Sequence, residues 1–255
     1  APSVPPAPSS RSSSSSHNDL PSTITEVRKH PDSSSTVHNY TRGRLLGKGG
    51  FAKVYHCTSE DSGKHYAVKV VPKANLVKTR ARQKLQAEIK IHRVLKHRRV
   101  VEYKHFFEDR ANCYILLELC HNQSMNELIK RRKRLTEPEV LYYMSQLIDG
   151  THYMHATNVI HRDLKLGNLF IDRHMGIKIG DLGLATKLSH SDERKRTICG
   201  TPNYIAPEII DGKGGHSFQV DIWSMGVIMY TLLVGKPPYE AKDVKSTYKR
   251  ILANV

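Results

Sequence analysis

The chain has 255 residues, enough for one large domain or two lobes. Its 40 lysines and arginines exceed its 24 acidic residues by 16, and this positive net charge favours anionic partners such as nucleotides or acidic proteins. Aromatic residues make up only 7%, with no array alternating basic and aromatic residues, so direct binding of nucleic acid is disfavoured. No apolar run is long enough to span a membrane, and the four cysteines form no CxxC pair, which argues against zinc and disulfides and suggests a reducing intracellular compartment.

Residues 1–37 are dominated by serine and proline and include the run Ser12–Ser16. A segment of this composition buries too little apolar surface to offset the entropy of ordering, so we predict a disordered tail. The tail could carry regulatory phosphorylation or serve as an inert leader.

Two apolar runs joined by glycines follow from Tyr40, in YTRGRLLGKGGFAKVYHCTS. Glycines let a backbone approach a phosphate and offer it N–H groups, so this strand, turn and strand could cover a nucleotide. An ordinary hairpin is the alternative, and a Walker A loop is excluded because no GK[ST] follows and the next element is a strand. The expected nucleotide contacts here are Leu46, Gly47, Lys48, Gly49, Gly50, Phe51, Ala52, Lys53 and Val54.

The segment KHYAVKVV has strand composition, and its period of two places Ala67 and Lys69 on one face. An adenine ring could lie on the small residue with phosphates beside the lysine, although an isolated lysine is more often an exposed edge residue. A basic helix is predicted at about residues 77–96, and its Glu88 could pair with Lys69 or with basic residues one turn away on the same helix.

The segment CYILLELC reads as a buried strand whose end connects two lobes. Backbone groups of Glu118 and Cys120 could pair with an adenine edge, and Leu117 could limit the pocket behind it. Two helices with capping-box starts follow, from Ser124 and from Thr136. Between them lies the run KRRKR, which we interpret as a solvated helix end rather than a localisation signal or a site for an acidic partner.

The stretch IHRDLKLGNLFIDRHMGIKIGDLG holds the candidate catalytic centre. Two short apolar runs separated by turn residues predict a hairpin that brings Asn168 close to Asp181. An amide oxygen and a carboxylate on neighbouring strand ends suit Mg²⁺, which keeps places free for substrate phosphates. Asp163 could orient a substrate hydroxyl and accept its proton, while Lys165 could offset charge on the transferred group. Each residue alone would be read as part of a surface loop, but the ordered set argues against that interpretation.

Three features follow the centre. Thr197 lies in a polar loop and could act as a phosphorylation switch, because a phosphate there would recruit Arg162 and nearby lysines. Residues 217–235 predict a buried apolar helix, whose Asp221 is expected to accept backbone N–H bonds from the catalytic loop rather than to catalyse. A shorter amphipathic helix closes the chain.

The motifs GKGGFA, AVKV, HRDLKLGN, DLG and APE stand in the order typical of eukaryotic protein kinases, which the chain resembles from about Tyr40 to its end. HRDLK resembles the serine/threonine branch, and HFFED, LELC, CGTPNYIAPE and GHSF resemble the polo-like kinases. The resemblance implies an α+β, two-lobed fold, with a small antiparallel β lobe and one helix at 38–118 and a mainly α-helical lobe at 119–255. It implies ATP and Mg²⁺ as cofactors, with Asp163, Lys165 and Asn168 as catalytic residues and Asn168 and Asp181 as metal ligands.

The implied function is transfer of the γ-phosphoryl group of ATP to serine or threonine in acidic context on protein substrates, in a cell-cycle or mitotic role under an upstream activating kinase. The implied locations are cytoplasm and nucleus, with centrosome and spindle, and the kinase region is expected to be monomeric. An inactive pseudokinase acting as a binding module is one alternative, and a glycine-loop nucleotide-binding protein of another fold is a second. Intact Lys69, Asp163, Asn168 and Asp181 favour catalysis, and the strand after the glycine turn disfavours the other fold.

The chain departs from the kinase pattern in three ways. Leu182 stands where most kinases carry phenylalanine and is expected to pack in the same way. Glu102 and His105 replace residues that are often small in polo-like kinases. The sequence ends at Val255 without further helices or a polo-box region, so we expect a fragment of marginal stability, with its apolar helix partly exposed and Glu208 without an arginine partner.

Overall fold

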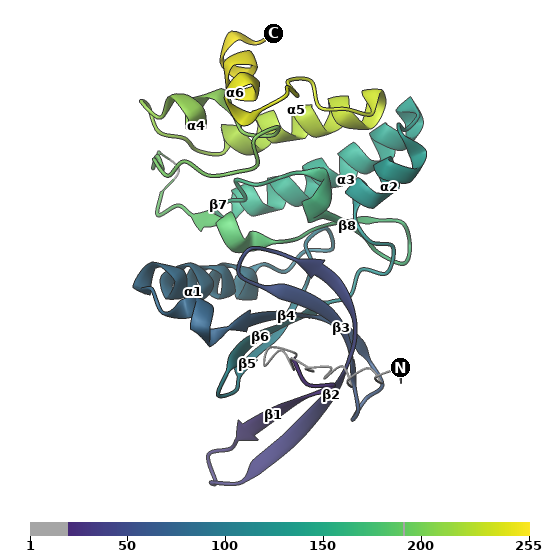
Figure 1. Ribbon diagram of the computed structural model, residues 1–255, viewed down its shortest axis with the longest axis vertical. Helices are drawn as coiled ribbons and strands as arrows, with labels where there is room; N and C mark the ends of the chain where they lie inside the picture. The colour runs from purple at the N-terminus through teal and green to yellow at the C-terminus, as the bar shows by residue number, and fades with distance from the viewer. Residues whose placement is uncertain (1–19, 191) are drawn as a thin grey trace, which may run out of the picture.

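The computed structural model describes residues 20–190 and 192–255, which form two stacked lobes, one rich in strands and one mainly helical (Figure 1). The predicted two-lobed α+β architecture is therefore confirmed. The prediction for residues 1–19 lies outside the described residues.

The smaller lobe is one six-stranded antiparallel sheet in the order β1-β2-β3-β4-β6-β5. One helix, α1 (Thr79–Val94), packs beside it with Glu88 and Ile91 among its buried residues. The strands are β1 (Thr23–Lys29), β2 (Ser35–Lys48), β3 (Lys53–Ser59), β4 (His65–Pro72), β5 (Tyr103–Glu108) and β6 (Asn112–Glu118).

The two faces of this sheet differ because successive side chains alternate. Val68 and Val70 of β4 point into an apolar cluster that also contains buried side chains of the other five strands. Ala67 and Lys69 lie on the opposite face, where the register places Leu117 across from Ala67 and Val54 across from Lys69. This face is the one that the sequence assigns to a nucleotide.

The two edge strands of the sheet meet through side chains, which shows that the sheet is strongly curled. Glu26 of β1 is 2% exposed, and one of its carboxylate oxygens lies 2.6 Å from Nε2 of His105 on β5. The same carboxylate accepts hydrogen bonds from Arg28 and from the Tyr40 hydroxyl. Burial alone would raise the pKa of Glu26, but the positive charges of Arg28 and His105 outweigh it and lower that pKa. His105, one of the departures from the kinase pattern, is thus a partner of this buried acid.

The predicted tail is too long at its C-terminal end. Residues 23–29 and 35–41 pair as an antiparallel hairpin, and Ile24 and Glu26 on its inner face are almost fully buried. The hairpin forms because TITEV alternates inward and outward side chains, a pattern that the surrounding serines and prolines obscure in an average over 37 residues. The β lobe therefore begins at Thr23 rather than at residue 38.

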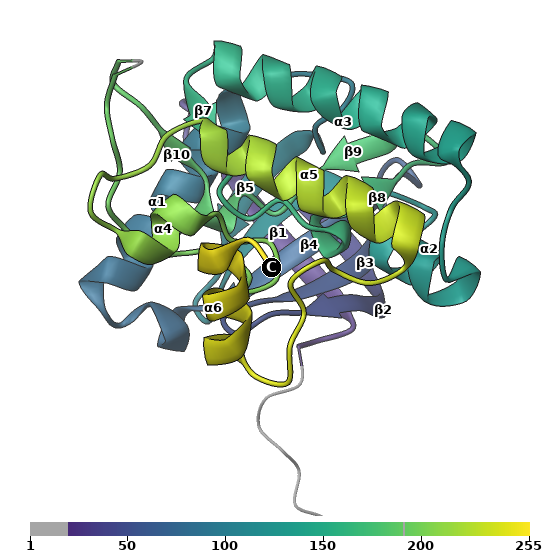
Figure 2. The same cartoon turned by 90° about the horizontal axis from the view of Figure 1, so that it is seen from above.

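The larger lobe is built around two long helices that lie side by side, α3 (Glu137–Ala156) and α5 (Gln219–Val234) (Figure 2). The Thr136–Glu139 capping box forms at the start of α3, whereas Ser124 at the start of α2 hydrogen-bonds the Glu127 carboxylate instead. The helices are α2 (Met125–Arg132), α3 (Glu137–Ala156), α4 (Pro207–Asp211), α5 (Gln219–Val234) and α6 (Val244–Ala253). The short strands are β7 (Val159–Ile160), β8 (Leu169–Ile171), β9 (Ile177–Ile179) and β10 (Thr186–Lys187).

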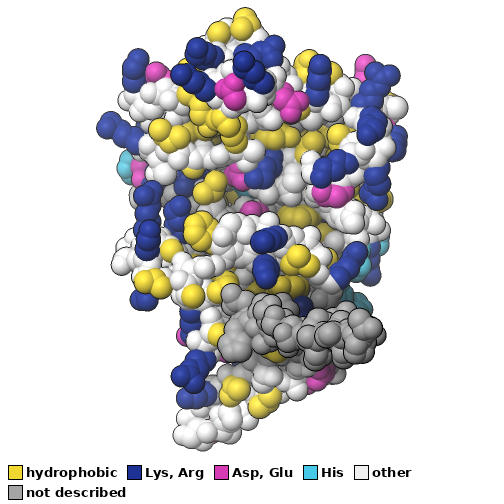
Figure 3. Space-filling model, in the orientation of Figure 1, with side chains coloured by type: hydrophobic (Ala, Val, Ile, Leu, Met, Phe, Trp, Pro, Cys, Tyr) yellow, Lys and Arg dark blue, Asp and Glu magenta, His cyan; other side chains and the backbone are white. Residues whose placement is uncertain are grey.

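Part of α5 is solvent-exposed, as predicted. Ile222, Met229 and Tyr230 are between 42% and 54% exposed, and apolar side chains gather near the top of this lobe (Figure 3). Glu208 makes no ion pair within residues 20–190 and 192–255. Leu182 is 1% exposed in the core of the lobe, so leucine packs where most kinases carry phenylalanine. Across the same residues, no helix combines the length and the apolar character that crossing a bilayer requires.

Candidate active site

Three charged side chains meet between the lobes. Nζ of Lys69 on β4 lies 2.6 Å from Oε1 of Glu88 on α1 and 3.3 Å from Oδ1 of Asp181, which follows β9. Glu88 is buried and pairs with Lys69 across the lobe, which confirms this partner over the alternatives along its own helix. Asp181 has a left-handed backbone, with φ of 55°, which sets the direction of its side chain.

Both Lys69 and Asp181 have pKa values that keep them charged. Burial lowers the pKa of Lys69, but Glu88 and Asp181 outweigh burial and raise that pKa overall. Burial raises the pKa of Asp181, and Lys69 with His161 reverses the effect and lowers it. At neutral pH the site therefore presents an ammonium group suited to phosphate and a carboxylate suited to a cation.

Asp163 is held by three neighbours and is 8% exposed. Its Oδ2 accepts hydrogen bonds from Nζ of Lys165 at 2.8 Å and from Nδ2 of Asn168 at 3.1 Å. Nδ2 of Asn168 also donates to the Asp163 carbonyl at 2.8 Å. Since the amide nitrogen of Asn168 faces Asp163, its amide oxygen remains as a candidate cation ligand.

The predicted hairpin that carries the metal-ligand candidates is present. β8 and β9 pair in register from Leu169 opposite Ile179, and the Gly180 N–H donates to the Asn168 carbonyl at 2.9 Å. Asn168 is thus fixed beside the residue that precedes Asp181. Within the described part of the chain no group of three or more histidine, cysteine and acidic residues could hold a metal. One amide oxygen and one carboxylate fit Mg²⁺, which completes its shell with water and phosphate oxygens.

Thr201 also belongs to this centre, although our sequence analysis did not predict a role for it. Its hydroxyl donates to Oδ1 of Asp163 at 2.7 Å and accepts from Nζ of Lys165 at 2.7 Å. Thr201 is 38 residues from Asp163 in the chain, so no local spacing links the two. With Asn168 and Lys165 on the other oxygen, both oxygens of the Asp163 carboxylate are held in place.

Asp221 anchors the catalytic loop, as predicted. Its fully buried carboxylate accepts the His161 N–H at 2.9 Å and the Arg162 N–H at 2.8 Å, and it contacts Nε2 of His155 at 2.8 Å. Arg162 has φ of 65°, and these bonds hold its left-handed backbone in place. The first helix turn of α5 therefore fixes the backbone two residues before Asp163.

The glycine turn closes between β2 and β3, where the Gly49 N–H donates to the Ala52 carbonyl at 2.8 Å. A Cβ atom added at Gly47 or at Gly50 would meet nothing within 4 Å, so packing inside the protein does not require glycine there. The space beside these residues is open, as a covering loop for phosphates needs. Phe51 at the tip is 69% exposed.

The connector between the lobes begins at Glu118. Its N–H donates to the Glu102 carbonyl at 2.9 Å, and its carboxylate accepts from Nζ of Lys178 at 2.8 Å. Cys120 follows and is partly buried, and burial raises the pKa of its thiol to about 12. Leu117 lies beside Ala67, so the residues assigned to the adenine pocket are neighbours in space.

Thr197 is exposed, and no hydrogen bond within the described residues joins it to Arg162. The Arg162 guanidinium is partly buried, and this burial lowers its pKa. Its Nε donates to the Leu184 carbonyl at 2.8 Å. Thr197, the predicted switch residue, is therefore accessible. The Arg162 guanidinium, which we expected to receive its phosphate, is partly removed from solvent.

Comparison with known proteins gives concordant matches. The family described as protein kinase domain matches residues 40–255. The chain is 61% identical to the probable serine/threonine-protein kinase CCRP1 of Zea mays, over 86% of this chain and 35% of that protein. It is 54% identical to the serine/threonine-protein kinase PLK1 of Xenopus laevis, over 95% of this chain and 39% of that protein. It is 56% identical to the probable serine/threonine-protein kinase PLK of Dictyostelium discoideum, over 87% of this chain and 22% of that protein. The chain thus spans well under half the length of these relatives.

Proposed function

Since this chain belongs to the protein kinase family and is a catalytic domain of the polo-like type, we propose that it transfers the γ-phosphoryl group of ATP to serine and threonine hydroxyls of protein substrates. The observation that carries the proposal is the Asp163 carboxylate, whose two oxygens are held by Lys165, Asn168 and Thr201. Donors on both oxygens fix the orientation of this carboxylate, and a positioned carboxylate can accept the proton of a substrate hydroxyl.

Each residue of the centre has a role in this reaction. Asp163 would orient the acceptor hydroxyl and take its proton, and Lys165 would offset negative charge on the group in transfer. Mg²⁺ held by Asn168 and Asp181 would neutralise charge on the ATP phosphates. Lys69, kept in place by Glu88, would hold the α- and β-phosphates from the other lobe.

The nucleotide would lie against the face of the sheet that carries Ala67 and Leu117. The adenine edge would meet the backbone of Glu118 and Cys120, where the Glu118 N–H is already used by Glu102 and its carbonyl is the candidate acceptor. The glycine turn would cover the phosphates, and the free space around Gly47 and Gly50 supports this role.

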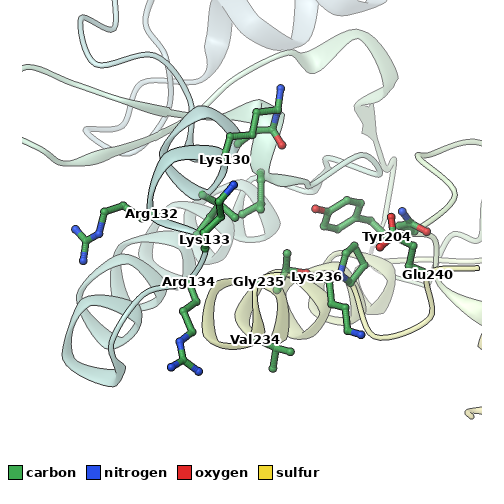
Figure 4. A pocket seen from close by; sticks show the side chains of 15 residues that line it. Lys130, Arg132, Lys133, Arg134, Tyr204, Val234, Gly235, Lys236 and Glu240 are labelled. Carbon is green, nitrogen blue, oxygen red and sulfur yellow. The ribbon is translucent and has the colours of Figure 1, made fainter.

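Acidic sequence around the acceptor would suit the surface beside the centre. A cavity of about 700 Å³ is lined by Leu166, which follows the catalytic loop, and by Tyr204 (Figure 4). Four residues at the end of α2 and just beyond it line this cavity: Lys130, Arg132, Lys133 and Arg134. The run KRRKR is the solvated helix end that we expected, since residues 130–134 are all exposed. Its positive charge would in addition attract acidic residues of a substrate bound beside the cavity.

Phosphorylation of Thr197 by an upstream kinase would regulate the enzyme. The exposed hydroxyl is accessible to such a kinase, and a phosphate would pair with Arg162 and neighbouring basic residues to order the loop. We also propose an intracellular location for the active protein, which the four free cysteines suit.

Replacing Asp163 by Asn tests the assigned chemistry. Transfer to casein should fall by about 10²–10⁴-fold, because the amide cannot accept the hydroxyl proton. Binding of ATP, measured by calorimetry, should be retained, and the exposed Asp211→Asn serves as the matched control. Transfer at the wild-type rate by the Asp163 variant would refute the assigned role, and ATP binding without any transfer by the wild type would favour the pseudokinase alternative.

A further inference from the structure

The loop that carries Thr197 is tied to the segment before α5 by two backbone hydrogen bonds. The Lys195 N–H donates to the His216 carbonyl at 2.9 Å, and the His216 N–H donates to the Lys195 carbonyl at 2.8 Å. They form one isolated antiparallel bridge outside the named strands. We call this pair of bonds the 195–216 bridge.

Gly215 allows the close approach that the bridge needs. Its φ is +69°, and a Cβ atom there would lie 2.9 Å from Cβ of Arg194 and 3.0 Å from the Lys195 carbonyl oxygen. Both the backbone angle and the space therefore exclude a side chain. Its neighbour Gly214 differs in both respects, since a Cβ atom there would meet nothing within 4 Å and its φ lies outside the left-handed region.

The segment on the α5 side of the bridge, His216 and Ser217, is buried. The side chains of His216 and Ser217 are each 2% exposed, and α5 begins two residues later. Burial and the nearby Arg162 lower the pKa of His216, so its ring is neutral at neutral pH and does not repel that arginine. The same stretch of chain carries Asp221, which holds the catalytic loop. The segment from His216 to Asp221 therefore holds both the catalytic loop and the Thr197 loop.

The other end of the Thr197 loop is attached to the catalytic centre. Thr201 bonds both Asp163 and Lys165, and Gly200 just before it would place a Cβ atom 3.2 Å from the Arg162 carbonyl oxygen. Residues 196–198 between the two attachments are exposed. Thr197 is thus presented on a short span that is fixed at both ends.

We propose that the 195–216 bridge is a positioning element that keeps Thr201 against Asp163 and Lys165. When the bridge opens, residues 196–201 keep only their catalytic attachment, and Thr201 holds Asp163 for a smaller fraction of the time. Gly215 and His216 act here as positioning residues, because neither reaches the reacting atoms. The proposal rests on the proposed kinase function, which makes Asp163 the proton acceptor.

Gly215→Ala and its matched control Gly214→Ala test the proposal in the full chain. The first measurement needs no activity: trypsin cleavage after Arg194, Lys195 and Arg196, followed by mass spectrometry. Cleavage should be on the order of tenfold faster in Gly215→Ala, because a left-handed alanine is strained and the bridge opens more often. Cleavage in Gly214→Ala should match the wild type. Equal rates in the two variants would overturn the bridge as a local restraint.

The second measurement is peptide phosphorylation. Gly215→Ala should lower kcat/KM for the peptide several-fold when the rate is expressed per ATP-binding site, counted by calorimetry, because a loss of folded enzyme alone would leave the rate per site unchanged. Faster cleavage with unchanged kcat/KM would overturn the link to Thr201. An absence of transfer by the wild type would instead refute the proposed function, while the cleavage comparison would still decide whether the bridge restrains the loop.

Amide hydrogen exchange of the wild type keeps the proposal falsifiable if Gly215→Ala does not fold. The amides of Lys195 and His216 should exchange much more slowly than that of Thr197, since only the first two donate hydrogen bonds in the bridge. Equally fast exchange at all three residues would show that the bridge is not formed in solution.

Discussion

Asp221→Ala should destabilise the protein severely, because it removes a buried acceptor from three donors. The carboxylate is fully buried and bonds the N–H groups of His161 and Arg162 and the ring of His155. Each buried polar group left without a partner costs about 1–3 kcal/mol, and the loss of one member of a buried charged pair costs about 3–5 kcal/mol. A total of about 3–5 kcal/mol corresponds to a fall in Tm of about 6–20 °C for a chain of this size.

Thermal unfolding followed by circular dichroism measures this loss. Asp221→Asn should fall between the wild type and Asp221→Ala, because its amide oxygen can accept one of the two backbone N–H groups. Asp211→Ala is the control, since Asp211 is exposed and its 3.4 Å pair with Lys213 should be worth no more than about 1 kcal/mol. A Tm for Asp221→Ala within about 2 °C of the wild type would refute the anchoring role. Transfer activity of any folded Asp221 variant should fall with the displacement of Asp163.

Three further outcomes follow from the same geometry. Glu88→Gln should lower kcat/KM for ATP on the order of a hundredfold, because Lys69 loses its closest carboxylate, while the exposed Glu60→Gln should leave the value unchanged. The Glu26 pKa is lowered from 4.5, so its stabilising effect is present above that value and is lost as pH falls through the folded pKa. Denaturant unfolding should then show a larger loss of stability in the wild type than in Glu26→Gln between about pH 5 and pH 3, and equal losses would contradict this. The Cys120 thiol, with a pKa of about 12, should have a thiolate fraction on the order of a thousandfold below that of a free cysteine, and iodoacetamide labelling as fast as that of glutathione would disprove it.

The parts of the site that the sequence predicted are those in which chemistry and local pattern agree. The hairpin between Asn168 and Asp181 follows from two short apolar runs and a turn, which specify it without distant contacts. The pairing of Lys69 with Glu88 joins residues 19 apart, and the strand and helix periodicities place both on inward faces. Asp221 was predictable as an anchor because an acidic residue at the start of an apolar helix needs buried donors.

The contacts that escaped prediction join segments that are remote in the chain. The Thr201 hydroxyl reaches Asp163 only after the intervening loop has folded back, and the sequence around it contains no acid or base that would identify it. Glu26 and His105 are 79 residues apart and meet only because the sheet curls. The first strand was missed for a different reason, since five alternating residues were averaged into a composition dominated by serine and proline.

The curled sheet has a consequence for how the glycine turn can move. β2 is held in place at Tyr40. This side chain is buried, stacks on Phe107 with ring centres 5.7 Å apart and hydrogen-bonds Glu26. Towards its tip β2 is exposed, and its pairing with β3 is irregular between Arg42 and Gly47. β2 can therefore bend beyond Arg42, where its pairing becomes irregular, while Tyr40 stays packed. Bending beyond that section would leave the packing around Tyr40 in place, so substitutions near the turn should change nucleotide affinity with little effect on the stability of the nucleotide-free β lobe.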